Sequence, residues 1–436
     1  MQTEINTSTR REYDPDGKIS RASYIIQAML EYCLVLATTS TFLTNLLNQL
    51  GFSTATQGVI SSMATLTISA EIFAVLLIRR RMRVKRMVII MTTLNELCFV
   101  LLYFTPFFDI PPGIRSTLFV VLITLGNALM WFPNPFRMAW QMSNVPNSKI
   151  GVFTAWKEIV SIAGGAVFSF VMGRIIDGYQ ARGDIRGSFI ICGITAAVLM
   201  VMNTVFMMLI REKEPENVNV QAVSFRENIK RSWRTTMCRR AFVQTLLANI
   251  LYRAAIAAND FSGAYQRNVL GFSMTFVSLL TVLYSVFRIS VSVPLGFYAD
   301  KKGWYKMLAP CFAVSAAAFM INVFALPGNG KPVFAVYYCL FAMASAGMDG
   351  GMLNLSFRAI PDECRTDAIA WQSAFGGLSG FLSSLAMSKL VAYIESNGNM
   401  LFGISVYPQQ VLNVISCMIF AVLTVYSIRL GKKTGA

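Results

Sequence analysis

The stretch "LGFYADKKGWYK" (residues 295–306) sets charged residues and two glycines between two long apolar runs. Its composition is that of a tight loop, and we expect both glycines to permit the reversal of the chain. The flanking runs approach the roughly 20 residues that a helix needs to cross a bilayer. Of the 436 residues, 55% are hydrophobic and 14% are charged, whereas a typical soluble domain has about 25% charged residues. This composition predicts an all-α integral membrane protein.

Twelve apolar segments are expected to be transmembrane helices. They are residues 23–47, 56–78, 87–107, 116–136, 150–173, 187–210, 241–265, 275–297, 307–326, 332–356, 367–392 and 407–430. The predicted domains are an N-terminal tail (1–22), a six-helix bundle (23–210), a central linker (211–240), a second six-helix bundle (241–430) and a C-terminal tail (431–436). No cleaved leader is expected, because the first apolar segment is too long for a signal peptide.

The net charge of +16 is unevenly distributed along the chain. When the N-terminus is placed inside, the inner segments hold most of the lysines and arginines, including the run "RRRMRVKR" (residues 79–86). This is the positive-inside bias, and it predicts that both termini are cytoplasmic. Because the positive charge follows the loops, we expect the lipid bilayer as a partner and no nucleic acid.

The sequence has eight cysteines, scattered singly, and no histidine. Zinc sites and disulfide frameworks need clustered or patterned cysteines, so neither is expected. Without histidine, His-based catalytic triads and His-ligated metals are excluded. We therefore predict no metal site, no cofactor and no enzymatic activity.

Two parts of the sequence repeat each other. The motif "LGFS" occurs at residues 50–53 and again at 270–273, and Pro146, Trp156 and Gly165 recur in one register as Pro361, Trp371 and Gly380. The chain is thus expected to be two copies of a six-helix unit. Small residues at every fourth position predict close helix packing in the fifth and eleventh segments: Ser161, Gly165, Ser169, Gly376, Gly380 and Ser384.

The opening stretch resembles the loop signature of the major facilitator superfamily, in which a glycine is followed by an aspartate, a cation, a second glycine and further basic residues. The matching residues are Gly296, Asp300, Lys301, Gly303 and Lys306. The segments "GVFTAWKEIVSIAGG" and "GRIIDGYQARG" also look like bacterial members of this superfamily. The resemblance covers essentially the whole chain. It implies a monomeric transporter in the bacterial inner membrane, with one half rocking against the other around a central site.

The first-half loop departs from the signature, because it has Arg81 in the place of the glycine and Lys85 in the place of the aspartate. We expect a compensating latch on the cytoplasmic side in the outward-facing state, in which the basic loop faces an acidic start of the eleventh helix. The alternative is that the arginines only set the topology. The residues assigned to this gate, besides the signature, are Arg83, Lys85, Arg86, Asp362, Glu363 and Asp367.

Ionisable residues within membrane helices are candidates for function, because a charge in hydrocarbon is unfavourable by several kcal/mol. Glu31 and Arg253 lie at nearly equivalent places in the two repeats, on helices that line the cavity in the superfamily. They are expected to face each other near the midplane, as a proton-coupling pair or a static ion pair. The candidate substrate- or ion-binding residues are Glu31, Tyr32, Glu96, Trp131, Asn134, Arg253, Asn259 and Asp260. The motif "WFPNPF" (residues 131–136) predicts a kinked helix beside a wet cavity.

These features predict a secondary transporter of a small polar organic solute, sugar-like in character and coupled to a proton or another cation. One alternative is a multidrug exporter with a cavity of methionine and phenylalanine side chains. Another is a non-transporting membrane sensor. The sequence does not distinguish import from export.

Overall fold

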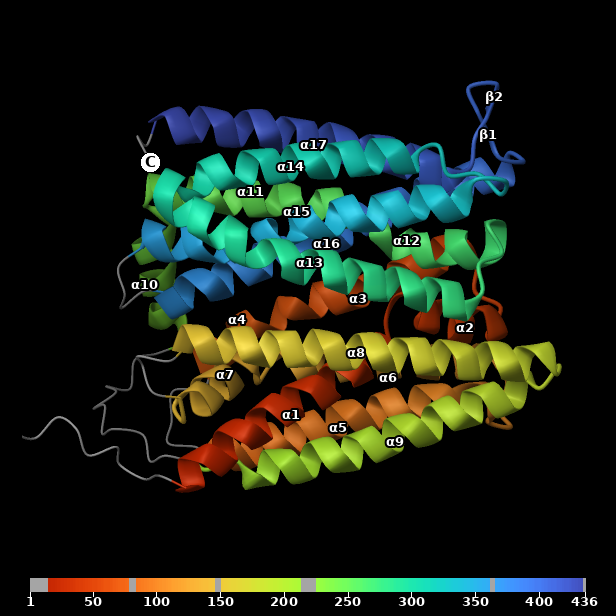
Figure 1. Cartoon of the computed structure of the whole chain (residues 1–436), viewed down its shortest axis with the longest axis horizontal. Helices are drawn as coiled ribbons and strands as arrows, with labels where there is room; N and C mark the ends of the chain where they lie inside the picture. Colours follow the sequence, from red (N-terminus) through yellow and green to blue (C-terminus); the bar gives the residue numbers. More distant parts are fainter. Residues whose placement is uncertain (1–14, 78–83, 146–149, 213–224, 361–364, 434–436) are drawn as a thin grey trace, which may run out of the picture.

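The computed structural model describes residues 15–77, 84–145, 150–212, 225–360 and 365–433. Within these residues the chain is almost entirely helical, and Figure 1 shows the helices running side by side in two stacked bundles. The end of α17 (Pro408–Lys433) and the basic turn from α13 (Met274–Lys302) to α14 (Trp304–Asn322) lie at one end of the molecule, which we call the basic end. The other end is called the opposite end.

The first bundle contains the helices of the N-terminal half. They are α1 (Pro15–Ala37), α2 (Ser40–Gln49), α3 (Thr54–Ile68), α4 (Ala70–Leu77), α5 (Val84–Phe104), α6 (Pro112–Trp131), α7 (Asn134–Met142), α8 (Ile150–Ala181) and α9 (Ile185–Leu209), with a 3-10 turn at Thr105–Phe107. In this half α1 packs against α8 and α9, and α5 packs against α6 and α9.

The second bundle follows α10 (Phe225–Met237), a helix at the basic end that contacts α4, α11 and α16. Its members are α11 (Arg240–Ile256), α12 (Asn259–Ala264), a π-helical turn (Tyr265–Val269), α13 (Met274–Lys302), α14 (Trp304–Asn322), α15 (Gly330–Ala359), α16 (Arg365–Ser396) and α17 (Pro408–Lys433). Strands β1 (Met400–Leu401) and β2 (Ile404–Ser405) form a hairpin between α16 and α17.

Among the described residues, ten helices are each long and apolar enough to cross a membrane. The pair α1 and α2 makes a further span with a bend of 42°, and α3 with α4 corresponds to the second predicted segment. The fold is therefore consistent with the twelve predicted crossings. Three of the crossings in the first half are broken helices. The break in the fourth was predicted from its two prolines, whereas the breaks in the first and second were not predicted.

Local chemistry accounts for two of these breaks. Between α1 and α2, the hydroxyl of Thr39 donates to the carbonyl oxygen of Val35 at 2.9 Å, a side-chain bond of the kind that bends helices. Between α6 and α7, Pro133 has no N–H to continue the helix, while Pro135 is tolerated in the first turn of α7. Helical structure therefore extends to Met142 beyond the predicted end of the fourth segment at residue 136.

The stretch 295–306 is more helical than its composition suggests. α13 continues through Lys302, and the reversal occurs at Gly303 alone, where φ is +94°. This backbone conformation favours glycine. Gly296 lies within α13 and has no positive φ, so the prediction that both glycines permit the turn is wrong for Gly296.

Small residues on α8 and α16 lie where other helices approach closely. A Cβ atom at Gly165 would be 2.4 Å from the Tyr32 ring on α1, and a Cβ atom at Gly376 would be 2.5 Å from the Asn249 amide on α11. Gly380 faces Thr65 of the other half at 2.6 Å. Ser161 and Ser169 of the same ladder are buried. The α1–α8 and α11–α16 contacts are thus counterparts in the two halves.

Candidate functional site

A cavity of about 450 Å³ lies between the two halves. Helices α1, α6, α7 and α8 line it from the first half, and α13 lines it from the second half through Tyr284, Ser285 and Arg288. Two adjoining cavities of about 260 and 220 Å³ share Tyr284 with it and extend among the helices of the second half. Tyr32, a predicted site residue, lines both the largest and the smallest of the three.

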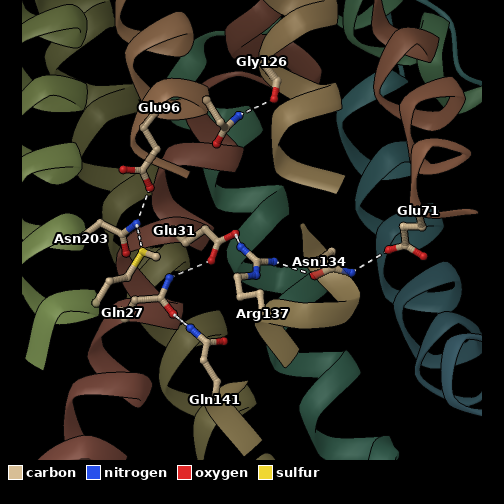
Figure 2. Close-up of polar contacts among 11 residues, drawn as sticks. Gln27, Glu31, Glu71, Glu96, Gly126, Asn134, Arg137, Gln141 and Asn203 are labelled. Atoms are coloured by element: carbon tan, nitrogen blue, oxygen red, sulfur yellow. Dashed lines mark hydrogen bonds and ion pairs between the residues drawn. The ribbon is translucent and has the colours of Figure 1, made fainter. Parts of the chain in front are cut away.

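Glu31 is the centre of a polar chain in the first half, shown in Figure 2. Its carboxylate accepts a bond from Nη1 of Arg137 and another from Nε2 of Gln27, the latter at 2.9 Å. Gln27 in turn accepts a bond from Gln141 at 2.9 Å. The side chains of Glu31 and Arg137 are only 14% and 11% exposed, so this ion pair is largely withdrawn from solvent.

The polar chain continues from Arg137 to the second crossing. Nη2 of Arg137 donates to Oδ1 of Asn134 at 2.8 Å, and Nδ2 of Asn134 donates to Oε1 of Glu71 at 2.7 Å. Asn134 was predicted to contact solute, and in this conformation its amide bridges an arginine and a glutamate. Trp131, at the end of α6, lines the largest cavity.

The predicted pairing of Glu31 with Arg253 is wrong for this conformation, because Arg137 of the same half is the partner of Glu31. The repeat relates positions in the two halves, but it does not make them neighbours. Arg253 lines the 260 Å³ cavity with Asp260 and Asp349, and its guanidinium lies 5.9 Å from the Tyr252 ring centroid.

Asn259 and Asp260 also line this second cavity. The Tyr337 hydroxyl donates to Oδ1 of Asn259 at 2.6 Å, and the Ser384 hydroxyl donates to the Asp260 carboxylate. Ser384 belongs to the predicted packing ladder, so that ladder also supplies a polar contact. Asn259 additionally lines the 220 Å³ cavity.

Glu96 stands apart from the cavities. It is 1% exposed, on α5, and one of its oxygens accepts a bond from Nδ2 of Asn203 on α9. Its second oxygen and Oδ1 of Asn203 have no hydrogen-bond partner among the described residues. The structure thus does not place Glu96 with the other predicted binding residues.

Arg288 links the two halves across the largest cavity. Its Nη2 atom lies 3.2 Å from Oδ2 of Asp349 on α15 and 3.6 Å from Oε1 of Glu158 on α8. The side chains of Glu158 and Asp349 are 54% and 44% exposed, so these ion pairs face open solvent-accessible space. Arg288 therefore contacts an acid from each half.

The halves are sealed together at the opposite end by polar contacts. Nδ2 of Asn48 donates to Oδ1 of Asn268 at 2.9 Å, and Nε of Arg267 donates to Oδ1 of Asn45 at 3.2 Å. The carboxylate of Asp177 on α8 accepts from the backbone N–H groups of Met274 and Thr275 at 2.9 and 2.7 Å. These two N–H groups belong to the first turn of α13 in the second half, where the helix dipole favours an anion.

The predicted latch residues lie at the basic end. Nζ of Lys85 donates to the carbonyl oxygen of Met208 at 2.7 Å, within the first half. Arg86, Lys301 and Lys306 are exposed, and Asp367 lies in the first turn of α16. Asp300 is exposed and makes no hydrogen bond or ion pair with the described residues. Arg83, Asp362 and Glu363 lie outside the described residues.

Several functional candidates were missed by the sequence reasoning. They are Gln27, Arg137, Gln141, Lys157 and Tyr284, all of which line the largest cavity. Arg137 directly follows the predicted end of the fourth segment. Its spacing of four residues from Gln141, like that of Gln27 from Glu31, is the signal of a polar helix face that could have found them.

The comparisons with known proteins agree with this architecture. The family model of the Major Facilitator Superfamily matches residues 23–384. A point variant of the nucleoside transporter NupG is similar in structure, with a TM-score of 0.73, 12% identity, and coverage of 94% of this chain and 99% of that chain. No curated protein sequence matches the chain.

Two further solved structures share the fold. The D-xylose–proton symporter has a TM-score of 0.63 and 15% identity, covering 93% of this chain and 96% of that chain. A bacterial homologue of the human lysosomal transporter Spinster, in an inward-facing and unoccupied conformation, has a TM-score of 0.64 and 12% identity, covering 96% and 98%. From the match over most of its length, this multi-pass membrane protein belongs to the major facilitator superfamily.

Proposed function

We propose that the protein is a secondary active transporter of a small polar organic solute, coupled to a proton or another cation. The observation that carries this proposal is the cavity between the halves, in which the buried Glu31–Arg137 pair lies beside the cross-half residue Arg288. Buried acids and bases of this kind mark ion and substrate pathways in membrane proteins. Transporter sites also lie at the interface of the two repeats.

The proposed movement is a rocking of the two halves about this cavity. The polar contacts of Asn48, Arg267 and Asp177 hold the halves together at the opposite end. If the basic end is cytoplasmic, as the positive-inside bias predicts, the structure corresponds to an inward-facing state. The similar Spinster homologue was also solved in an inward-facing conformation. In the outward-facing state these contacts would break, and the halves would close further at the basic end, where α4 already packs against α16.

Proton coupling is proposed to occur at Glu31. A proton on this carboxylate would remove its charge and weaken its hold on the Arg137 guanidinium. Arg137, which also donates to Asn134, would then be free to bind the solute with its other guanidinium nitrogen. Loss of the proton would restore the pair and release the solute. The cation-coupled step therefore lies in the first half, next to the cavity.

We propose a neutral, polyhydroxylated solute with one apolar face, such as a sugar or a nucleoside. The adjoining cavities offer hydroxyl and amide groups beside aromatic rings: Asn259, Ser262, Thr281, Tyr284, Tyr337, Tyr338 and Phe341. Acidic and basic side chains both line the site and pair with one another. The site therefore needs no opposite charge from the solute, which favours a solute without net charge. A nucleoside transporter and a D-xylose–proton symporter are among the proteins with this fold. The charged lining of the largest cavity does not favour export of lipophilic drugs.

The test is the thermal stability of the purified protein across a solute panel at two pH values. The panel holds sugars, nucleosides, carboxylates, amino acids and lipophilic cations. A ligand that binds only the folded state at a hundredfold excess over its Kd stabilises that state by about 2.7 kcal/mol. We expect one polyhydroxylated class to raise the melting temperature, and Glu31→Gln to change the pH dependence of that shift.

Glu227→Gln is the matched control, because Glu227 is an exposed glutamate on α10, outside the cavity lining. It should leave the shift and its pH dependence as in the wild type. Stabilisation by lipophilic cations alone would overturn the proposed solute class and support drug export instead.

A further inference from the structure

The hairpin between α16 and α17 has an unusual residue at its tip. Strands β1 and β2 pair with Leu401 opposite Ile404, which leaves Phe402 and Gly403 as a two-residue loop. Both have positive φ, +50° and +79°. A tight turn of this kind favours asparagine, aspartate or glycine at its first position. A phenylalanine in this left-handed conformation is an outlier, and it indicates a use for the ring at that place.

The ring of Phe402 is almost free of contact with the residues that the structure describes. Phe402 is 95% exposed and its neighbour Ile404 is 65% exposed. The base of the hairpin is fixed, since Asn399 N–H donates to the Ile394 carbonyl on α16 and Val406 N–H donates to the Asn399 carbonyl, both at 2.9 Å. A fixed base therefore presents an apolar tip outward.

The direction of the hairpin relates this tip to the membrane. Figure 1 shows the hairpin at the opposite end, projecting sideways past α17, across the direction of the helices. Because the helices run along the membrane normal, a sideways projection lies in the plane of the bilayer. The tip is thus directed toward surrounding lipid rather than toward the aqueous space beyond the helix ends.

The neighbouring surface is also apolar. Phe324 and Leu326, which follow α14 at this end, are 62% and 43% exposed, and Met418 and Val422 on the outer face of α17 are 55% and 57% exposed. The side chain of Gln410, in the first turn of α17, donates to the Val323 carbonyl at 2.7 Å, so the α14 end lies next to the start of α17. No Asp, Glu, Lys or Arg occurs anywhere in residues 396–428.

We propose that the β1–β2 hairpin is a lipid anchor, in which Phe402 and Ile404 insert into the boundary between head groups and acyl chains. Apolar side chains that lie in this interface bury about 5–10 Å into the leaflet. The exposed apolar residues after α14 and on α17 face lipid in a membrane-spanning bundle, and the hairpin directly precedes α17. A bilayer therefore covers the hairpin, and Phe402 gains its contacts from lipid.

The test places an environment-sensitive fluorescent amino acid at position 402 of the full-length protein, reconstituted in lipid nanodiscs. The matched control position is Ala181, the exposed last residue of α8 at the same end, which is followed by the charged residues Arg182 and Asp184. We expect blue-shifted emission at 402, quenching by nitroxide-labelled lipid and little quenching by aqueous iodide. The probe at 181 should show the reverse.

A second variant separates the role of the Phe402 ring from that of the hairpin. Phe402→Asn suits the left-handed turn and keeps the hairpin, so a probe at position 404 should move from lipid to water in this variant. Iodide quenching at 402 as strong as at 181 would overturn the proposal. So would a blue shift at 402 that depends on protein concentration and not on lipid nitroxide, because that result would show self-association through the hairpin.

Discussion

Arg137→Met is expected to lower the free energy of unfolding by about 3–5 kcal/mol, because it leaves the buried carboxylate of Glu31 without its cation. The side chains of this pair are 11% and 14% exposed, so water does little to replace the lost contact. Arg137 also loses its bond to Asn134, which bridges to Glu71. The free energy is measured by unfolding the purified protein with dodecyl sulfate in mixed micelles.

The double variant Glu31→Gln/Arg137→Met should recover much of this loss, because it removes both charges. Arg288→Met is the matched control, since its acid partners Glu158 and Asp349 are about half exposed. A pair of that kind is worth about 0–1 kcal/mol. Equal losses for Arg137→Met and Arg288→Met, with no recovery in the double variant, would contradict the coupling of Glu31 with Arg137.

Asp177→Ala is expected to open the seal at the opposite end. Its carboxylate accepts two N–H bonds from the first turn of α13 in the other half. A carboxylate at a helix N-terminus contributes up to about 2 kcal/mol in a partly buried geometry. A loss of 1–2 kcal/mol shifts a two-state ratio by roughly 5- to 30-fold. The variant should therefore populate the outward-open state more.

The shift is measured with a cysteine at Thr281, which lines the 220 Å³ cavity, in a background where the exposed Cys238 is serine. A membrane-impermeant maleimide applied from the opposite end should label it faster in Asp177→Ala. Asp184→Ala is the control, because Asp184 accepts from Gly187 N–H at 2.7 Å within its own half. Equal acceleration by both substitutions would mean that the seal does not depend on the cross-half contact.

Much of the architecture follows from the sequence, because the apolar segments and the repeat are strong signals. The breaks were harder to predict. The fourth segment was predicted to end at residue 136, just after its two prolines, yet Pro135 is accommodated in the first turn of α7 and the helix runs on to Met142. That error placed Arg137 outside the membrane segment. The eighth segment was ended at residue 297 because charged residues follow it, but α13 runs on through Lys302 and only Gly303 departs from helix.

The candidate site was likewise predictable from the sequence only in part. Tyr32, Trp131, Asn259 and Asp260 line cavities, and their polar or aromatic character within apolar segments was visible in the sequence. The partner of Glu31 was not, because a repeat relates two positions by symmetry and not by contact. Arg137 pairs with Glu31 because it lies on α7, whose direction is set by the break in the helix at Pro133. The sequence alone did not give that direction.

The most direct test of the central claim separates solute movement from proton coupling in proteoliposomes. With the solute class that stabilises the wild type, the experiment compares counterflow exchange with accumulation driven by a pH gradient, in the wild type and Glu31→Gln. We predict that Glu31→Gln keeps counterflow and loses pH-driven accumulation, since the neutral amide mimics the protonated carboxyl but cannot release a proton. Undiminished pH-driven accumulation in Glu31→Gln would contradict the account, because the coupling proton would then bind elsewhere.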